Sequence, residues 1–207
     1  MTRVIGIIGA SRSGSTILGN ILGNLPDVVN VGESHWLHKA DTMASRPEWA
    51  GQPYPCRACG TDCGILSPIT KWTKDDGPWW EAVSAAYGNP EFLVSTDKSK
   101  RFFDQYGLPD AVILLYRDPV YWAKSWAERH EMTPQEAAGV WARLYERALK
   151  WLDKRDLECV SVNWSEFRAD TSSFLPRFVN VDGGGMACGM VPAEALDWNN
   201  GQHFVGG

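Results

Sequence analysis

The first 25 residues constrain the fold most, because a β-rich run, a glycine-bearing loop and a helical pattern follow one another directly. Residues 4–8 are apolar and rich in isoleucine and valine, which predicts a buried strand. Within residues 15–25, leucine and isoleucine recur at helical spacing. The loop between them carries Gly9 and Gly14. Backbone N–H groups and the helix dipole would point at one spot there, so the segment predicts an anion-binding loop.

This loop departs from the nucleoside-triphosphate pattern at one position. That pattern is G-x-x-x-x-G-K-S/T, in which the lysine reaches the β- and γ-phosphates and the hydroxyl binds Mg²⁺. Ser15 stands at the lysine position, Thr16 follows it, and the nearest cation is Arg12 inside the loop. We therefore expect an anion other than a magnesium triphosphate. The alternative is a tight turn without a ligand, which two glycines after a strand also allow.

A second apolar run ends in a cation. Residues 111–116 predict a buried strand of the parallel type, and Arg117 follows directly. Pro119 suits the first turn of a helix that carries Ser125. An arginine at the carboxyl end of a strand lies where α/β sheets collect ligands, and its planar fork pairs with phosphate oxygens. Taken alone, the segment favours a surface ion pair for Arg117 and a solvated Ser125, but beside an anion-binding loop both residues can converge on one phosphate.

Together these two segments resemble the PAPS-dependent sulfotransferases of the bacterial and Golgi type, which use 3′-phosphoadenosine 5′-phosphosulfate (PAPS) and release the bisphosphate PAP. The family's loop has the form R-S/T-G-S/T-S/T, and its later segment has the form R-D-P-x-x-x-x-x-S; residues 12–16 and 117–125 match these forms. The resemblance implies that the later segment, through Arg117 and Ser125, binds the 3′-phosphate. It assigns to the 5′-phosphosulfate the residues Ser11, Arg12, Ser13, Gly14, Ser15 and Thr16.

The same resemblance implies catalytic residues. Residues 25–33 end in Gly-Glu, like the family segment that supplies a catalytic carboxylate, so Glu33 is the expected general base on the acceptor hydroxyl. Residues 95–100 resemble a D-S-S-K segment, which implies that Lys100, or its neighbour Lys98, completes a cationic clamp with Arg12. No metal is required for this chemistry. The alternatives are a helix-capping role for Glu33 and solvated positions for the lysines.

The remaining patterns predict the fold class. Strands are expected near 3–8, 28–31, 92–96, 111–116 and 158–163, and helices near 15–25, 78–87, 119–130 and 134–154. Their alternation predicts an α/β fold, a three-layer P-loop-type parallel sheet flanked by helices, in a single domain over residues 1–207. Thr133 and Glu136 predict a capping box at the start of the last helix. The expected core face of that helix comprises Val140, Leu144, Ala148 and Trp151.

Residues 45–77 are rich in proline, glycine and cysteine and predict an insertion beside the sheet. Cys56, Cys59 and Cys63 form half of a zinc-site pattern, but the second half is missing from the sequence, and His35 or His38 would have to arrive by folding. We expect free thiols and no metal.

Composition excludes some partners. A net charge of −5 and a pI near 5.4 argue against a nucleic-acid or membrane surface as partner. The sequence has neither a secretory signal nor an apolar stretch of membrane-spanning length, so a cytoplasmic enzyme is expected.

The expected function is sulfuryl transfer from PAPS to the hydroxyl of a small-molecule or glycan acceptor, such as a sugar or a phenol. The first alternative is a P-loop kinase for a nucleotide or small molecule, which would need the missing lysine. The second is a nucleotide-binding module without catalysis. The sequence leaves the acceptor and the oligomeric state open.

Overall fold

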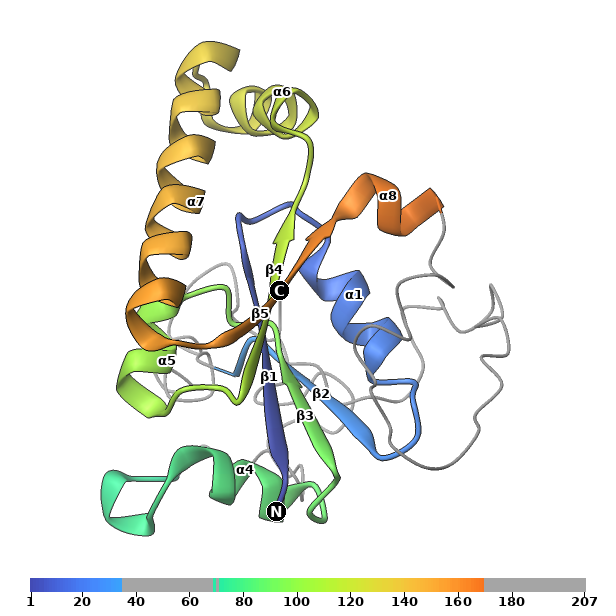
Figure 1. The fold of residues 1–207 in the computed structure, drawn as a ribbon, viewed down its shortest axis with the longest axis vertical. Helices are drawn as coiled ribbons and strands as arrows, with labels where there is room; N and C mark the ends of the chain where they lie inside the picture. Colours follow the sequence, from blue (N-terminus) through green and yellow to red (C-terminus); the bar gives the residue numbers. More distant parts are fainter. Residues whose placement is uncertain (35–68, 70, 170–207) are drawn as a thin grey trace, which may run out of the picture.

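The computed structural model describes residues 1–34, 69 and 71–169. In this part of the chain, one parallel sheet has the strand order β2-β3-β1-β4-β5 (Figure 1). The strands are β1 (Arg3–Gly9), β2 (Val28–Gly32), β3 (Phe92–Ser95), β4 (Ala111–Tyr116) and β5 (Glu158–Asn163). The expected parallel sheet is confirmed.

Helices cover both faces of the sheet (Figure 1). They are α1 (Ser15–Leu22), α4 (Trp79–Ala86), α5 (Lys100–Tyr106), α6 (Pro119–His130), α7 (Pro134–Arg155) and α8 (Trp164–Ala169), with a short 3-10 turn η3 (Lys74–Asp76). Strand β4 shows the layering most plainly. Val112 and Leu114 pack into a cluster with α4, α5, α6 and α7, whereas Ile113 and Leu115 pack into a second cluster with α1 and α8. The alternation places one apolar layer on each face of the sheet, so the three-layer α/β class is confirmed.

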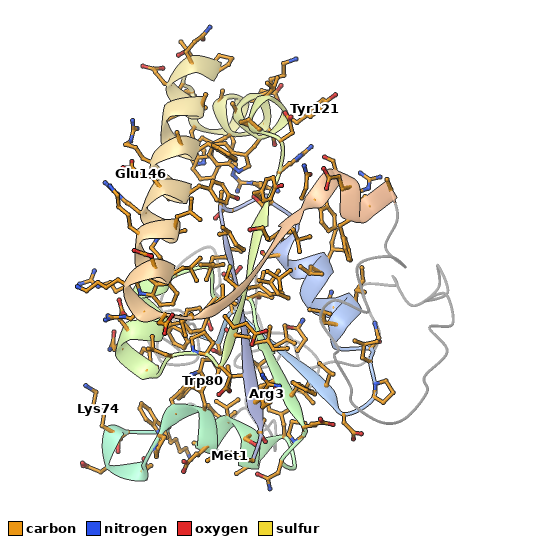
Figure 2. All side chains as sticks on the ribbon, in the orientation of Figure 1. Met1, Arg3, Lys74, Trp80, Tyr121 and Glu146 are labelled. Atoms are coloured by element: carbon orange, nitrogen blue, oxygen red, sulfur yellow. The ribbon has the colours of Figure 1, made fainter. Side chains whose placement is uncertain are left out.

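Helix α7 begins as the sequence predicts. The side chain of Thr133 accepts the N–H of Glu136, whose carboxylate accepts the N–H of Thr133. The outer face of α7 carries an exposed ion pair between Glu146 and Lys150, and Glu146 points into solvent (Figure 2). The inner face differs from the expectation, because Val140 and Leu144 are only partly buried. The residues of α7 that are buried are Ala137, Tyr145, Ala148, Trp151 and Leu152.

Two helices lie where the sequence pattern gave no signal. Helix α5 buries the adjacent residues Phe102 and Phe103, and adjacent aromatics do not produce a helical period. Helix α8 has six residues, too few for periodicity to be visible. Helix α1 ends at Leu22, earlier than expected, where Gly23 donates to the carbonyl of Gly19 at 2.9 Å.

Several predictions fall on residues outside the described part of the chain. They include the cysteine cluster and most of the insertion at 45–77. Among the residues that the structure describes, no group of three or more His, Cys, Asp and Glu side chains is arranged to hold a metal ion. Within the same residues, no helix is both long enough and apolar enough to span a membrane.

Candidate functional site

The sheet order gathers the predicted site residues along one edge. Glu33 follows β2, Lys98 lies just beyond β3, the glycine-bearing loop follows β1, and Arg117 follows β4. All these strands run parallel, so their carboxyl ends meet at the same edge of the sheet. Because β1 lies between β3 and β4, the loop that follows β1 lies between Lys98 and Arg117. Neighbouring strands are about 4.8 Å apart. This edge is where open α/β sheets bind their ligands.

Gly14 is essential to the shape of the loop. It caps α1 with φ of 93°, a left-handed conformation that favours glycine. A Cβ atom at this position would lie 2.5 Å from the ring of Trp164, which belongs to α8. Arg12 also has a positive φ, 71°, so the loop turns sharply twice before the helix begins. The sequence GASRSG therefore folds into a tight turn that delivers the chain to the helix N-terminus.

The first backbone N–H groups of α1 have no hydrogen-bond partner among the described residues. Leu18 donates to the carbonyl of Gly14 at 3.0 Å, the first regular bond of the helix. The amides of residues 14–17 make no hydrogen bond to any described residue. Ser13 differs, because its N–H donates to the carbonyl of Ala10 at 3.2 Å and closes the loop. The N–H donors from Gly14 to Ile17, which we call the anion cradle, lie at the positive end of the helix dipole, an arrangement that suits an anion.

Side chains anchor this loop from two helices. Trp122 of α6 donates its indole N–H to the carbonyl of Ser11 at 2.7 Å. The buried hydroxyl of Ser13 is 3.2 Å from the hydroxyl of Tyr145 on α7. The side chain of Ser15 is also buried, while Ser11, Arg12 and Thr16 are exposed.

The β4 side of the edge carries positive charge that has no ion-pair partner in the described part of the chain. Arg117 is half-buried at the end of β4, and Asp118 caps α6 by accepting the N–H groups of Val120 and Tyr121 at 2.9 and 3.3 Å. Neither Arg12 nor Arg117 forms an ion pair with a described residue. Ser125 is half-buried on α6, two helical turns beyond the cap. Its convergence with Arg117 on one phosphate stays a prediction.

On the β2 and β3 side, charges are paired. Glu33 forms an ion pair with Lys98, and their side chains are only 14% and 21% exposed. Next to this pair, the buried carboxylate of Asp97 accepts hydrogen bonds from the hydroxyls of Ser34 at 2.7 Å and Ser95 at 2.6 Å. These bonds tie the end of β2 to the end of β3, which fixes the position of Glu33.

Lys100 opens α5 beside the loop. With Lys98 it lines a cavity of about 40 Å³ next to Gly9 and Ala10. Burial lowers the pKa of Lys100 from its ordinary value, the positive charge of Arg147 lowers it further, and Asp104 opposes the change. The structure therefore places both candidate lysines near the loop, and it pairs Lys98 with Glu33.

The sequence patterns missed three residues that shape the site, namely Asp97, Trp122 and Tyr145. Asp97 follows β3 closely, so it could have been predicted from the rule that ligands bind at the carboxyl ends of parallel strands. Trp122 and Tyr145 act through bonds to loop atoms that are 111 and 132 positions away in sequence. No local pattern signals contacts of that range.

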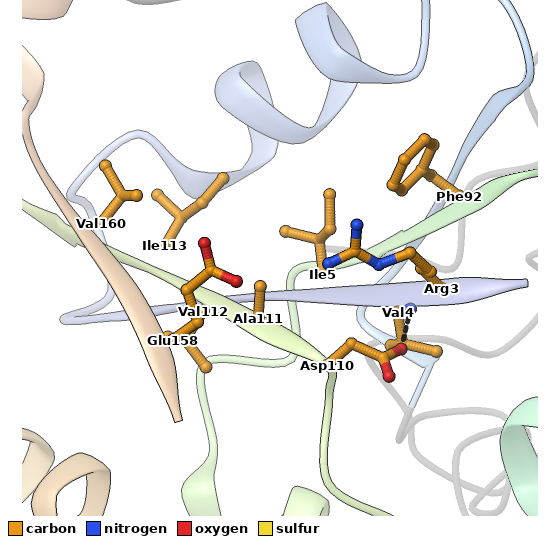
Figure 3. A pocket seen from close by; sticks show the side chains of 10 residues that line it. All are labelled: Arg3, Val4, Ile5, Phe92, Asp110, Ala111, Val112, Ile113, Glu158 and Val160. Atoms are coloured by element: carbon orange, nitrogen blue, oxygen red, sulfur yellow. Dashed lines mark hydrogen bonds between the residues drawn. The ribbon is translucent and has the colours of Figure 1, made fainter. Parts of the chain in front are cut away.

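A larger cavity lies at the opposite edge of the sheet. Its volume is about 90 Å³, and Figure 3 shows its lining side chains. Among them, Arg3, Phe92, Ala111 and Glu158 are the first residues of β1, β3, β4 and β5. This cavity is thus at the amino ends of the strands, away from the anion cradle.

Comparison with known proteins identifies the fold. No protein-family model and no curated protein matches the sequence. The structure is similar to the sulfotransferase domain from the curacin biosynthetic pathway, with a TM-score of 0.61 and 16% identity over 98% of this chain and 87% of that domain. It is also similar to the sulfotransferase domain from the Synechococcus PCC 7002 olefin synthase, with a TM-score of 0.60 and 17% identity over 95% of this chain and 77% of that domain. The chain has the fold of sulfotransferase domains.

Proposed function

We propose that the protein transfers a sulfuryl group from PAPS to the hydroxyl of an acceptor molecule. The observation that carries this proposal is the anion cradle, whose amides at residues 14–17 have no partner among the described residues, together with Arg12 and Arg117, which form no ion pair with a described residue. The fold shared with sulfotransferase domains supports it.

The cradle suits a phosphosulfate better than a magnesium triphosphate. In triphosphate-binding loops a lysine reaches the β- and γ-phosphates, and here that position is the buried Ser15. Four amides and an arginine can neutralise the smaller charge of a 5′-phosphosulfate without a metal. The exposed residues Ser11 and Thr16 complete the proposed ligand contacts, and Ser13 contributes by closing the loop through its N–H bond to the carbonyl of Ala10. Arg117, with Ser125, would bind the 3′-phosphate as a bidentate partner.

The reaction that we propose is an in-line displacement at sulfur. The acceptor oxygen forms a bond to sulfur while the bond from sulfur to the 5′-phosphate oxygen breaks. The electron pair of the broken bond stays on that phosphate oxygen, which belongs to PAP after transfer. Amides of the loop and Arg12 stabilise the charge that develops there. The acceptor proton moves to the carboxylate of Glu33, which acts as general base.

The sheet order supports a position for the acceptor near β3. Glu33 at β2 and the loop at β1 are separated by β3, a span of about 10 Å. The acceptor hydroxyl would enter this space, between the base and the sulfur. Lys98 stands at the end of the intervening strand and is paired with Glu33, so we assign to Lys98 the positioning of the base. Lys100, which lines the cavity next to Gly9 and Ala10, would supply the cationic clamp.

Transfer of a radioactive sulfuryl group tests the proposal. The protein is incubated with radiolabelled PAPS, a chelator of divalent metals and acceptors that represent sugars, phenols and aliphatic alcohols, with Glu33→Gln as the matched control. We expect label in at least one acceptor class and far less with the variant. Phosphate transfer from γ-labelled ATP with magnesium, together with no sulfuryl transfer, would instead support the kinase alternative.

A further inference from the structure

The hydroxyl of Tyr145 joins three parts of the site. Tyr145 lies on α7 and is 7% exposed. Its hydroxyl donates to the carbonyl of Leu115, near the end of β4, at 2.8 Å. The N–H of Ala10, the first residue of the loop, donates to the same hydroxyl oxygen at 3.2 Å. The hydroxyl of Ser13 lies 3.2 Å from it.

The directions of these bonds follow from counting protons. Burial raises the pKa of Tyr145, although bonds from Ser13 and Ala10 oppose the change, so the phenol is neutral at physiological pH. Its single proton goes to the carbonyl of Leu115, which can only accept. Ala10 and Ser13 must therefore both donate to the phenol oxygen, which has two lone pairs. Since the N–H of Ser13 already donates to Ala10, both donors of Ser13 point into the protein.

The ring of Tyr145 is held independently of its hydroxyl. It packs against Trp141 with ring centroids 4.5 Å apart and against Tyr116 at 6.4 Å. It also belongs to the 22-residue helix α7, a rigid element. Removal of the hydroxyl alone would therefore leave the ring in place and remove the three bonds.

We propose that Tyr145 is a positioning residue, which holds the loop at residues 10–13 in its anion-binding shape before any ligand arrives. Because Ala10 and Ser13 donate to partners within the protein, the amides of residues 14–17 are the loop donors that have no partner among the described residues. A loop already in the bound shape loses less conformational freedom on binding, so the bond network raises affinity for the phosphate end of the ligand. The effect on PAP affinity rests on the proposed function, whereas the effect on the loop does not.

Hydrogen exchange of the ligand-free protein tests the effect on the loop. Tyr145→Phe is compared with Tyr116→Phe, because the hydroxyl of Tyr116 has no hydrogen bond to any described residue and its ring touches the same cluster. We expect exchange at Ala10, Ser13 and Leu18 to be about tenfold faster in Tyr145→Phe and unchanged in Tyr116→Phe. Unchanged exchange at these amides, or acceleration spread evenly over the whole chain, would overturn the proposal.

Calorimetric titration with PAP tests the effect on binding. We expect the Kd of Tyr145→Phe to be about tenfold higher than that of the wild type, and that of Tyr116→Phe to be unchanged. Ser13→Ala removes one of the three bonds and keeps the tyrosine, so we expect a smaller rise in Kd, about threefold. This variant tests the proposal if Tyr145→Phe does not fold. Equal Kd values for wild type, Tyr145→Phe and Ser13→Ala would overturn the positioning role. If the wild type does not bind PAP but hydrogen exchange in the loop is faster in Tyr145→Phe, only the proposed function is contradicted.

Discussion

The two sides of the loop differ in how their charged side chains are paired. On the β2 and β3 side, Glu33 is paired with Lys98, and the carboxylate of Asp97 accepts two serine hydroxyls. On the β4 side, Arg117 forms no ion pair with a described residue, and neither does Arg12 in the loop itself. Glu33, Lys98 and Asp97, on the paired side, thus have partners within the protein, whereas the two arginines, on the open side, have no ion-pair partner among the described residues.

This difference fits two kinds of ligand. An acceptor hydroxyl is neutral, so the side that receives it can be fully bonded beforehand and needs only a well-placed base. A nucleotide phosphate is an anion, and unpaired arginines attract it and pair with it on arrival. The protein has a net charge of −5, so Arg12 and Arg117 at one edge of the sheet are a local positive region in a negative protein. The first three variants below each change one side alone, and the fourth changes neither.

The largest effect is expected from Glu33→Gln on the paired side. Glutamine keeps the size of the side chain and can accept a bond from Lys98, but it cannot take a proton. We expect kcat to fall by roughly 10²–10⁴-fold, while PAP affinity and Tm change little. Steady-state kinetics with PAP calorimetry and thermal melts measure these quantities, and Glu128→Gln on the exposed face of α6 is the matched control. Intact turnover with a lower Tm would assign Glu33 a capping or structural role.

On the open side, Arg117→Ala should weaken PAP binding by about 1.5–3 kcal/mol, because a bidentate charge-assisted contact is lost. The loss should nearly disappear for AMP, which lacks the 3′-phosphate. Calorimetry with both nucleotides makes the comparison, with Arg143→Ala on the exposed face of α7 as control. An equal loss for PAP and AMP would show that Arg117 has another partner.

A smaller effect is expected from Asp97→Asn, which tests whether the paired side is held by its own bonds. Both hydroxyls donate to the same carboxylate oxygen, Oδ2, so an amide oxygen in its place keeps both hydrogen bonds but removes the negative charge that strengthens them. We expect the free energy of unfolding to fall by about 1.5 kcal/mol and PAP affinity to stay near that of the wild type. Denaturant titration measures the first quantity. A large loss of PAP affinity would mean that the two sides are not independent.

The smallest effect is expected from Asp104→Asn on α5, which is not one of the candidate site residues. Burial opposes ionisation there, but bonds from Arg155 and Trp151 outweigh it and hold the pKa of Asp104 below its ordinary value of about 3.8. A carboxyl with a lowered pKa in the folded state stabilises the fold above about pH 4, and this contribution is lost as pH falls through the folded-state pKa. We expect Asp104→Asn to lower Tm slightly at pH 7, and we expect this difference to shrink as pH falls below about 4 through the folded-state pKa. A Tm difference that stays constant over this range would contradict the assignment.

Most of the fold could be predicted from the sequence. The apolar runs and helical periods located all five strands of the sheet and the helices α1, α4, α6 and α7, because local patterns determine them. Helix α5 was missed because Phe102 and Phe103 are adjacent. The expected core face of α7 was partly wrong, since Tyr145 is buried and points to the loop, whereas Leu144 is only partly buried.

The candidate site was predictable only in part. The resemblance to the sulfotransferases pointed to Glu33, the end of a predicted strand pointed to Arg117, and the glycine pattern pointed to the loop. The pairing of Glu33 with Lys98 depends on β2 and β3 being neighbours, which no spacing in the sequence reveals. The support of the loop by Trp122 and Tyr145 is likewise a tertiary contact.

The most direct test of the account is the choice between PAP and ATP. Calorimetry on the wild-type protein, with each nucleotide and with a metal chelator present, measures both affinities under the same conditions. The account predicts that PAP binds at least about tenfold more tightly than ATP, since Arg117 meets the 3′-phosphate and no lysine reaches a γ-phosphate. Tighter binding of ATP, or ATP binding that rises above that of PAP when magnesium is added, would contradict it.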